Sequence, residues 1–315
     1  MTTISPTGST TAGGPATGTD ALLQVRDLTV TFATPRGPLD AVRSLDLDLE
    51  PGGALGIVGE SGSGKSMTSL AIMGLQPRAA RRTGSVRLRG RELVGMSEAD
   101  LRRVRGDRIA MVFQDPLSSL NPYYTVGLQI EEAYRAHRPG VTRRAAHKVA
   151  IAALERVHIR DAARRVNHYP HQFSGGMRQR VMIAMALSTE PELLIADEPT
   201  TALDVTVQAQ ILDLLQEIRR ETGTGLVLIT HDLAVVSEIT DHIVVMKDGV
   251  CVERGAVEQI FTSPQHPYTQ ALLDAVPRID DEIGELRAVA PGSAPFLVPD
   301  PAAPDRVVFK KGGPA

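Results

Sequence analysis

The apolar positions of the chain change their period several times, and each change marks a different kind of element. From Leu22 to Phe32 apolar and polar residues alternate (LLQVRDLTVTF), and the alternation returns in SVRLRG at 85–90. A period of two, broken by turn residues such as PGG, predicts an antiparallel β layer. The unbroken apolar run ALGIVG at 54–59 instead predicts a buried strand.

The middle of the chain, about 115–172, changes to a helical period. Val149, Ala152, Ala153 and Val157 recur at helical spacing within TRRAAHKVAIAALERVH. This pattern predicts an inserted helical subdomain that presents one apolar stripe.

Helices and strands then alternate. A helix is predicted at 177–188, a strand at 193–197 (LLIAD), a helix at 206–221 and a strand at 225–230 (GLVLIT). Such an alternation implies parallel strands joined by crossover helices, so the predicted fold class is α/β.

The two ends of the chain differ from this core. HIVVMKDGVCVERG predicts a hairpin with Asp248 and Gly249 in its turn, and SPQHPYTQALLDAVPR at 263–278 predicts a short helix. The Pro-rich last twenty-five residues are expected to be loosely ordered. The Ser/Thr/Gly/Pro/Ala-rich residues 1–20 predict a disordered tail.

Composition and charge narrow the classes of protein. The net charge of −3 and pI near 6.3 give no general attraction to nucleic acid. No apolar run approaches the roughly 18 residues that span a bilayer, and no signal-peptide pattern opens the chain. One cysteine, Cys251, excludes an internal disulfide and a multi-cysteine metal site. We therefore expect a soluble chain in a reducing cytoplasm.

The first candidate site is GESGSGKS at 59–66, which matches G-x-x-x-x-G-K-[ST] between a predicted strand and a predicted helix. Glycines let the loop backbone point its N–H groups at phosphate oxygens, and the helix adds its positive end. Lys65 is expected to reach the β- and γ-phosphates, and Ser66 to bind Mg²⁺. The alternative, a glycine-rich turn without ligand, is disfavoured by the full strand–loop–helix order. The predicted phosphate-binding residues are Gly59, Glu60, Ser61, Gly62, Ser63, Gly64, Lys65 and Ser66.

The second candidate is the pair of acids that ends LLIADE. Asp197 is expected to hold Mg²⁺ through its water shell, and Glu198 to orient and deprotonate an attacking water. A strand that ends in a solvated acidic turn is the alternative. The second acid favours hydrolysis by water over transfer to a bound acceptor.

Four further residues are weaker candidates when taken singly. Gln114, Asp204 and His231 follow predicted core strands, where open α/β sheets bind ligands, although polar loop residues are common there. Phe32 is either an adenine-stacking residue or a core phenylalanine.

The stretch FSGGMRQR places Ser174, Gly175 and Gly176 at the start of a predicted helix. It is a second anion-ready helix start without a nucleotide motif of its own, so it implies the phosphate of a partner. An ordinary helix capped by Ser174 leaves the glycine pair unexplained.

Together, the phosphate loop, Gln114, FSGGM, LLIADE, TTALD and His231 resemble the ATP-binding cassette (ABC) ATPases over about residues 22–275. The resemblance implies a RecA-like P-loop core with an antiparallel β subdomain and a helical subdomain. It also implies ATP and Mg²⁺ as cofactors, bound between two subunits. By this resemblance Phe32 stacks the adenine, His231 senses the γ-phosphate and Asp204 lies at the subunit interface. Gln114 contacts Mg²⁺ and water and joins the helical subdomain, which touches the permease.

Longer stretches narrow the resemblance. FQDPLSSLNP, HYPHQFSGGMRQRVMIAMAL and SPQHPYTQALLDAVPR look like the ATPase subunits of oligopeptide, dipeptide and nickel importers, and Met177 resembles the D-type subunit. The resemblance implies an F-type ATPase partner, two permease subunits and an extracytoplasmic binding protein, with this chain peripheral on the cytoplasmic face of the membrane. The implied function is an ATP-hydrolysing subunit that powers the import of di- or oligopeptides through the permease. Nickel or another small solute is the alternative, because an ATPase chain does not contact the solute.

The resemblance also suggests a division into a tail (1–20), an ATPase domain (21–262) and a C-terminal extension (263–315). The family's C-terminal tail often carries a cysteine cluster that holds an iron–sulfur centre. This tail has no cysteine, so no such cluster is expected.

Three other classes of protein are alternatives to a transport ATPase. An ABC ATPase acting on DNA or ribosomes has some support from clustered arginines, although a solvated face is favoured. A P-loop kinase has no use for FSGG, and a regulator with a dead site is disfavoured by the presence of Lys65, Asp197 and Glu198. The clustered arginines are Arg81, Arg82, Arg87, Arg89, Arg91, Arg102, Arg103 and Arg105.

Overall fold

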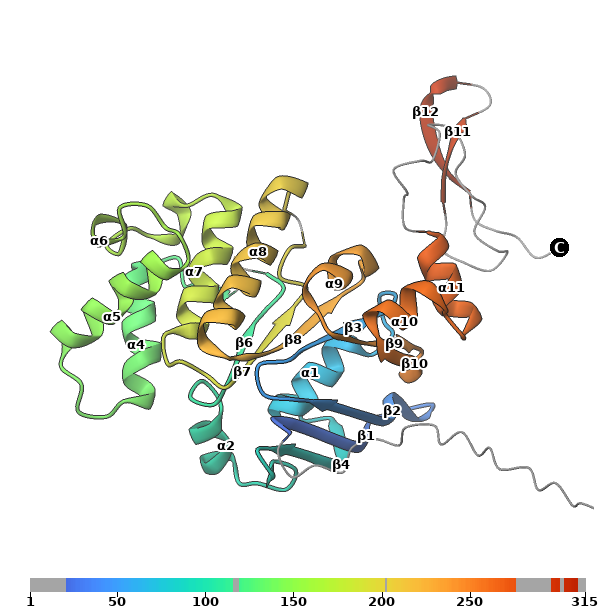
Figure 1. Ribbon diagram of the computed structural model, residues 1–315, viewed down its shortest axis with the longest axis horizontal. Coiled ribbons are helices and arrows are strands. Elements are labelled where there is room, and N and C mark those ends of the chain that lie inside the picture. The colour runs from blue at the N-terminus through green and yellow to red at the C-terminus, as the bar shows by residue number, and fades with distance from the viewer. Residues whose placement is uncertain (1–20, 116–118, 202, 276–295, 301–302, 311–315) are drawn as a thin grey trace, which may run out of the picture.

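The computed structural model contains two main sheets with helices packed around them (Figure 1). It describes residues 21–115, 119–201, 203–275, 296–300 and 303–310. The predicted tail at 1–20 lies outside the described residues.

The first sheet is antiparallel and has the strand order β2-β1-β4-β5. Its strands are β1 (Leu23–Thr34), β2 (Gly37–Leu49), β4 (Ala80–Leu88) and β5 (Arg91–Glu92). The alternation in the sequence therefore predicted this layer correctly, because only one face of each strand packs against the core.

The second sheet has the strand order β10-β9-β3-β8-β7-β6, and all its neighbouring pairs are parallel except β9 with β10. Its strands are β3 (Ala54–Val58), β6 (Ile109–Val112), β7 (Leu193–Asp197), β8 (Gly225–Thr230), β9 (His242–Lys247) and β10 (Val250–Ala256). The β9–β10 turn has Asp248 and Gly249 at φ 49° and 80°, which confirms the predicted hairpin.

Both faces of the second sheet are buried. In β3, Ala54 and Val58 belong to one apolar cluster, together with residues of α7, α8 and α9. Leu55 and Ile57 belong to a second cluster, together with residues of α1, α2 and the antiparallel sheet. The helices concerned are α1 (Lys65–Met73), α2 (Glu98–Val104), α7 (Gly175–Leu187), α8 (Val205–Thr222) and α9 (Leu233–Ile239).

The helical segment lies at one side of the core in Figure 1. It comprises α4 (Val126–His137), α5 (Arg143–Arg156), α6 (Ala162–Arg165) and a 3₁₀ turn at Pro170–Gln172. The predicted apolar stripe of α5 was wrong at Ala152, which is exposed. Ala153 and Val157 are buried as predicted. The helix also buries Ala146, Ala150 and Leu154, because the small alanines let α4 and α7 approach closely.

The C-terminal part contains more regular structure than its composition predicts. Helix α11 (Pro267–Asp274) was expected, whereas α10 (Val257–Thr262) was not. The expected loose order is wrong for β11 (Phe296–Asp300) and β12 (Ala303–Lys310), which pair antiparallel. Each strand contains one proline, but the runs FLV and RVVF have the β-branched and aromatic residues that suit strands. Across the described residues no helix is both long enough and apolar enough to cross a bilayer.

Candidate functional site

The loop 59–66 connects β3 to α1 and curls through two glycines in the left-handed region. Gly62 has φ 83° and Gly64 has φ 99°. A Cβ on Gly64 would lie 2.5 Å from the Ala41 carbonyl oxygen, whereas a Cβ on Gly62 would meet nothing within 4 Å. Gly64 is therefore required by packing as well as by conformation, and Gly62 keeps an open side of the loop.

Lys65 begins α1 and is buried, with 4% of its surface exposed. Its Nζ donates to the carbonyl oxygens of Gly59 and Glu60 at 2.7 and 2.8 Å. Burial lowers the pKa of the Lys65 ammonium, against the opposing charges of Glu198 and Asp197. The loop thus holds a poorly solvated cation directly beside its own backbone.

Asp197 is the last residue of β7 and is also buried. The Ser66 hydroxyl donates to Asp197 Oδ1 at 3.0 Å, so the ends of β7 and the loop are joined. Burial raises the pKa of Asp197, and the Ser66 hydrogen bond opposes that shift. A hydroxyl and a carboxylate oxygen in contact are the hard ligands that suit Mg²⁺.

Glu198 follows Asp197 with φ 45°, a left-handed conformation uncommon for a residue with a side chain. Its Oε2 accepts from Gln114 Nε2 at 2.8 Å and from Thr201 Oγ1 at 2.9 Å. His231 Nδ1 lies 3.5 Å from the other oxygen, Oε1. The structure therefore brings the predicted residues Gln114 and His231 to the carboxylate of the predicted Glu198.

Thr201 was missed by the sequence reasoning. The available signal is its position three residues after Glu198, where a hydroxyl can turn back to the carboxylate.

These groups surround a cleft of about 750 Å³. Among the predicted residues of the phosphate loop and the acidic pair, Ser63 and Asp197 do not line it, and Asp197 is hydrogen-bonded to Ser66, which does. The Ser63 hydroxyl is buried without a hydrogen-bond partner, whereas the backbone N–H of Ser63 donates to the Glu60 carbonyl. Three lining residues were not predicted. The lining consists of Ala41, Gly59, Glu60, Ser61, Gly62, Gly64, Lys65, Ser66, Met67, Gln114, Glu198, His231 and Leu272.

Phe32 does not line this cleft. It lies near the end of β1, opposite Leu39 and Ala80 on the neighbouring strands, and is half-buried against the second apolar cluster. Adenine stacking by Phe32 stays a prediction.

Ser174 and Asp204 also lie outside the cleft lining, each as the N-cap of a helix. Ser174 Oγ accepts from Met177 N at 3.4 Å at the start of α7, and Asp204 Oδ1 accepts from Val207 N at 3.0 Å at the start of α8. Both are exposed. The ordinary capping interpretation thus describes their local geometry correctly.

The two glycines after Ser174 differ in what surrounds them. A Cβ on Gly176 would lie 2.3 Å from Val207 Cγ1, so α7 can approach α8 only with glycine at this position. A Cβ on Gly175 would meet only Leu203 Cδ2, at an ordinary 3.6 Å. Packing within this chain therefore explains Gly176 and leaves Gly175 unexplained.

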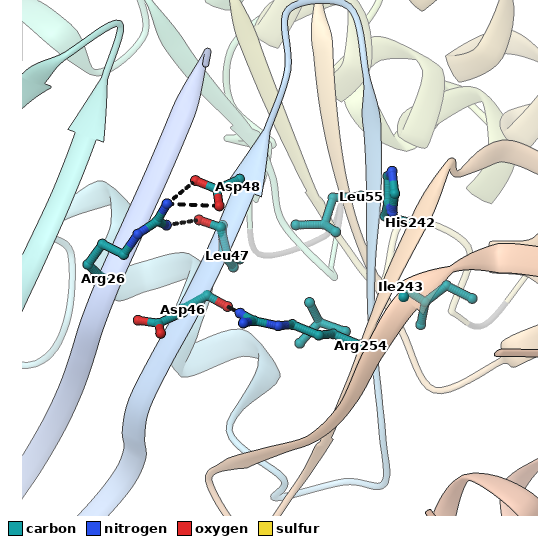
Figure 2. A pocket seen from close by; sticks show the side chains of 10 residues that line it. Arg26, Asp46, Leu47, Asp48, Leu55, His242, Ile243 and Arg254 are labelled. Atoms are coloured by element: carbon teal, nitrogen blue, oxygen red, sulfur yellow. Dashed lines mark hydrogen bonds and ion pairs between the residues drawn. The ribbon is translucent and has the colours of Figure 1, made fainter. Parts of the chain in front are cut away.

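A second cleft, of about 380 Å³, lies between the antiparallel sheet and the β3–β9–β10 side of the core (Figure 2). Its arginines are engaged by strand β2: Arg26 donates to Asp48 and to the Leu47 carbonyl, and Arg254 donates to the Asp46 carbonyl. The Arg254 contact joins the two sheets, whereas the Arg26 contacts stay within the antiparallel sheet, so the cleft lies at the seam between the sheets.

Two family profiles match parts of the chain. The sequence profile of the ABC transporter family matches residues 42–201, and that of the oligopeptide/dipeptide transporter C-terminal region matches 252–301.

Two relatives are named oligopeptide transport ATP-binding protein OppD. The chain is 51% identical to that of Escherichia coli, over 89% of this chain and 82% of the relative. It is 50% identical to that of Haemophilus influenzae, over 88% and 85%.

Two solved structures share the fold. The dimeric ATP-binding cassette MJ0796, bound to ADP and Pi after hydrolysis, is 30% identical with TM-score 0.67, over 75% of this chain and 98% of that one. CbiO1 of Clostridium perfringens, part of an ABC transporter complex, is 27% identical with TM-score 0.66, over 78% and 92%.

Proposed function

The chain belongs to the ABC transporter family of ATP-binding proteins, and we propose that it hydrolyses ATP to power the import of peptides through a membrane permease. The observation that carries this proposal is the Gln114–Glu198–His231 cluster facing the Lys65 loop across one cleft. Nickel or another small solute is the alternative cargo.

In this proposal the loop 59–66 binds the triphosphate. The N–H groups of the loop and the start of α1 face the phosphate oxygens. Lys65 Nζ exchanges its two carbonyl acceptors for β- and γ-phosphate oxygens, which are stronger partners because they are charged. Burial of Lys65 strengthens this attraction, since little water screens it.

Ser66 and Asp197, with Gln114 at the opening of the cleft, would hold Mg²⁺. When bound, the ion neutralises charge on the β- and γ-phosphates. The Ser66–Asp197 hydrogen bond holds these two oxygen ligands together beforehand. Asp197 must be ionised to serve, and its buried position makes that form costly without a cation.

Glu198 is the proposed general base. Gln114 and Thr201 both donate to Oε2, so Oε1 is the oxygen left to accept a proton from the attacking water. His231 lies beside that same oxygen and is proposed to contact the γ-phosphate. Glu198 lines the cleft from a left-handed backbone conformation, and its N–H donates to the Ile229 carbonyl at 2.8 Å, which anchors the backbone there.

We propose that the Ser174–Gly175 helix start contacts the γ-phosphate bound by a second ATPase subunit. The exposure of Ser174 and the absence of an internal reason for Gly175 support this assignment. Asp204 would lie at the same interface, and Phe32 would stack the adenine. Met177 favours an F-type partner in a heterodimer over a homodimer.

Membership of an ABC transporter family implies a transport complex that includes permeases. Exposed aromatic residues support a docking surface for them near Gln114. Phe113, which directly precedes Gln114, is 42% exposed, and Tyr123, Tyr124 and Tyr169 are 85%, 47% and 40% exposed. We propose that this surface contacts two permease subunits at the cytoplasmic face of the membrane. An extracytoplasmic binding protein would deliver the solute.

Most of the clustered arginines contact carbonyl or carboxylate groups of this chain. Arg82 and Arg105 donate to backbone carbonyls at the end of α1. Four others pair with acids: Arg87 with Glu92, Arg89 with Glu192, Arg102 with Glu98 and Arg103 with Asp100. This pairing supports a transport ATPase without a nucleic-acid partner.

We propose the division into a tail (1–20), an ATPase domain (21–262) with its helical subdomain at about 115–172, and an extension (263–315). The two profile matches, 42–201 and 252–301, fall on either side of the unmatched residues 202–251. The lack of an iron–sulfur cluster stays a prediction.

The test is the ATPase rate of this chain alone, with an F-type partner, and with permeases in lipid, each with and without peptide-loaded binding protein. We expect a low rate alone and a rise on full assembly with loaded binding protein. A complete complex that ignores peptide would contradict the cargo. A lone chain that is fully active and ignores the permeases would contradict transport.

A further inference from the structure

Helix α11 is used by nothing in the mechanism above, yet it reaches the phosphate loop. The Tyr268 hydroxyl accepts a hydrogen bond from the backbone N–H of Glu60, at 3.1 Å. Leu272, one turn later on the same face of α11, lines the ATP cleft. Tyr268 is 8% exposed, and its ring belongs to the apolar cluster of the core.

The position of α11 is fixed from outside the loop. The Glu253 carboxylate of β10 accepts from the backbone N–H groups of Gln265 and His266, at 2.7 and 3.0 Å. His266 Nδ1 then caps the helix by accepting from Tyr268 N at 3.1 Å. Lys247 Nζ, at the end of β9, lies 4.7 Å from the centre of the Tyr268 ring, which is cation–π geometry.

The rest of the loop is supported by the same hairpin. The Gly249 N–H, in the β9–β10 turn, donates to the Ser63 carbonyl at 3.0 Å. A Cβ on Gly59 would lie 2.1 Å from the Met246 carbonyl oxygen, so β9 touches the start of the loop. Glu60 follows Gly59 directly and lies between these two contacts along the loop. The Tyr268 hydroxyl accepts the hydrogen bond of the Glu60 N–H.

We infer that Tyr268 is a positioning residue for the ATP site: its hydroxyl fixes the first turn of the phosphate loop, and through it the C-terminal extension sets the affinity for nucleotide. This inference rests on the proposed ATP site and deepens it. Lys65 Nζ bonds to the Glu60 carbonyl, so the residue that Tyr268 holds also places the lysine. A loop whose N–H groups are ordered before binding loses less entropy when phosphate arrives.

The test compares Tyr268→Phe with the full-length wild-type chain. The phenylalanine keeps the ring in the core and removes only the acceptor of the Glu60 N–H. We expect Kd for a fluorescent ATP analogue to rise about three- to tenfold, as for one lost hydrogen bond. In the assembled transporter KM for ATP should rise while kcat stays within about twofold, because Glu198 and Gln114 are untouched.

Gln270→Ala is the matched control, since the Gln270 side chain, on the same helix, donates to the Pro264 carbonyl at 3.1 Å. It should leave Kd unchanged. Hydrogen–deuterium exchange of the peptide that spans 59–66 should accelerate in Tyr268→Phe and not in Gln270→Ala.

An unchanged Kd together with unchanged exchange in Tyr268→Phe would overturn the inference, and so would an equal rise of Kd in both variants. A wild-type chain that binds no ATP would instead contradict the proposed function itself.

Discussion

Two helix starts in this protein are built to face an anion, and they differ in how much of a binding site surrounds them. The loop before α1 has a buried lysine, two nearby carboxylates and a cleft. The start of α7 has an exposed serine and glycine, and neither residue lines the cleft beside the phosphate loop. In the proposed function, the first helix start binds ATP within this chain, and the second serves the ATP bound by a partner subunit. The comparison therefore predicts that hydrolysis needs a second subunit although ATP binding does not.

The largest effect is expected from Glu198→Gln, which removes the proposed general base beside the phosphate loop. Hydrolysis should fall about 10²- to 10⁴-fold while ATP binding persists, because the loop and Lys65 are unchanged. Turnover and nucleotide Kd measure the two effects separately. Glu155→Gln, on an exposed position of α5, is the control. Hydrolysis near the wild-type rate would exclude the assigned role of Glu198.

Ser174→Arg changes the second helix start, at the N-terminus of α7. In the assembled complex we expect hydrolysis at the shared site to drop about tenfold or more, since a bulky side chain replaces a phosphate donor. The isolated chain should bind ATP as before, because Ser174 does not line its own cleft. Ser97→Arg changes an N-cap of the same type, at the start of α2, and should leave turnover intact. Loss of ATP binding by the isolated Ser174→Arg chain would contradict the comparison.

The glycine pair separates structure from function. Gly176→Ala should lower Tm by several degrees, because overpacking against Val207 typically costs about 1–3 kcal/mol. Gly175→Ala should leave Tm nearly unchanged and reduce hydrolysis only in the assembled complex. Thermal unfolding of both variants and turnover with the partner subunit check this pair. If Gly175→Ala destabilises the isolated chain as much as Gly176→Ala, no partner is needed to explain Gly175.

The smallest effect concerns Asp197 in nucleotide-free protein with Mg²⁺ chelated. Burial raises its pKa in the folded state, so ionisation costs stability at pH values above the unfolded pKa. Asp197→Asn should therefore raise Tm slightly at neutral pH. The gain should shrink as pH falls and both folded and unfolded wild-type states become protonated. Thermal unfolding from pH 7 to pH 4 tests this, and a gain that grows toward acid pH would refute it.

The sequence predicted the elements best where one rule decides them. The loop 59–66 needs particular residues at fixed spacing, so its place between strand and helix followed directly. The apolar runs at β3, β7 and β8 were predicted because fully buried parallel strands carry no polar face. In α5 alanines occur on several faces of the helix, so the sequence does not show which face is buried. Packing against α4 and α7 buries Ala150 and leaves Ala152 exposed.

Within the candidate site, sequence order identified the groups but not their distances. Gln114 and Glu198 are 84 positions apart, and their 2.8 Å contact exists because β6 and β7 are neighbours in the sheet. Thr201 escaped notice because a threonine after an acidic pair has many ordinary uses.

What the sequence by itself determined was the chemistry: the phosphate loop, the paired acids, the capped helix start at Ser174 and the resemblance these carry together. Those features are local, and local spacing fixes which backbone and side-chain groups can serve one ligand. The tertiary structure decided which distant groups share a site. It paired Oε2 of Glu198 with Gln114 and Thr201, set Oε1 beside His231, assigned Gly176 to packing and Gly175 to an exposed position, and placed the Tyr268 hydroxyl on the Glu60 N–H. Each of these depends on how strands and helices far apart in sequence pack, which no local pattern encodes.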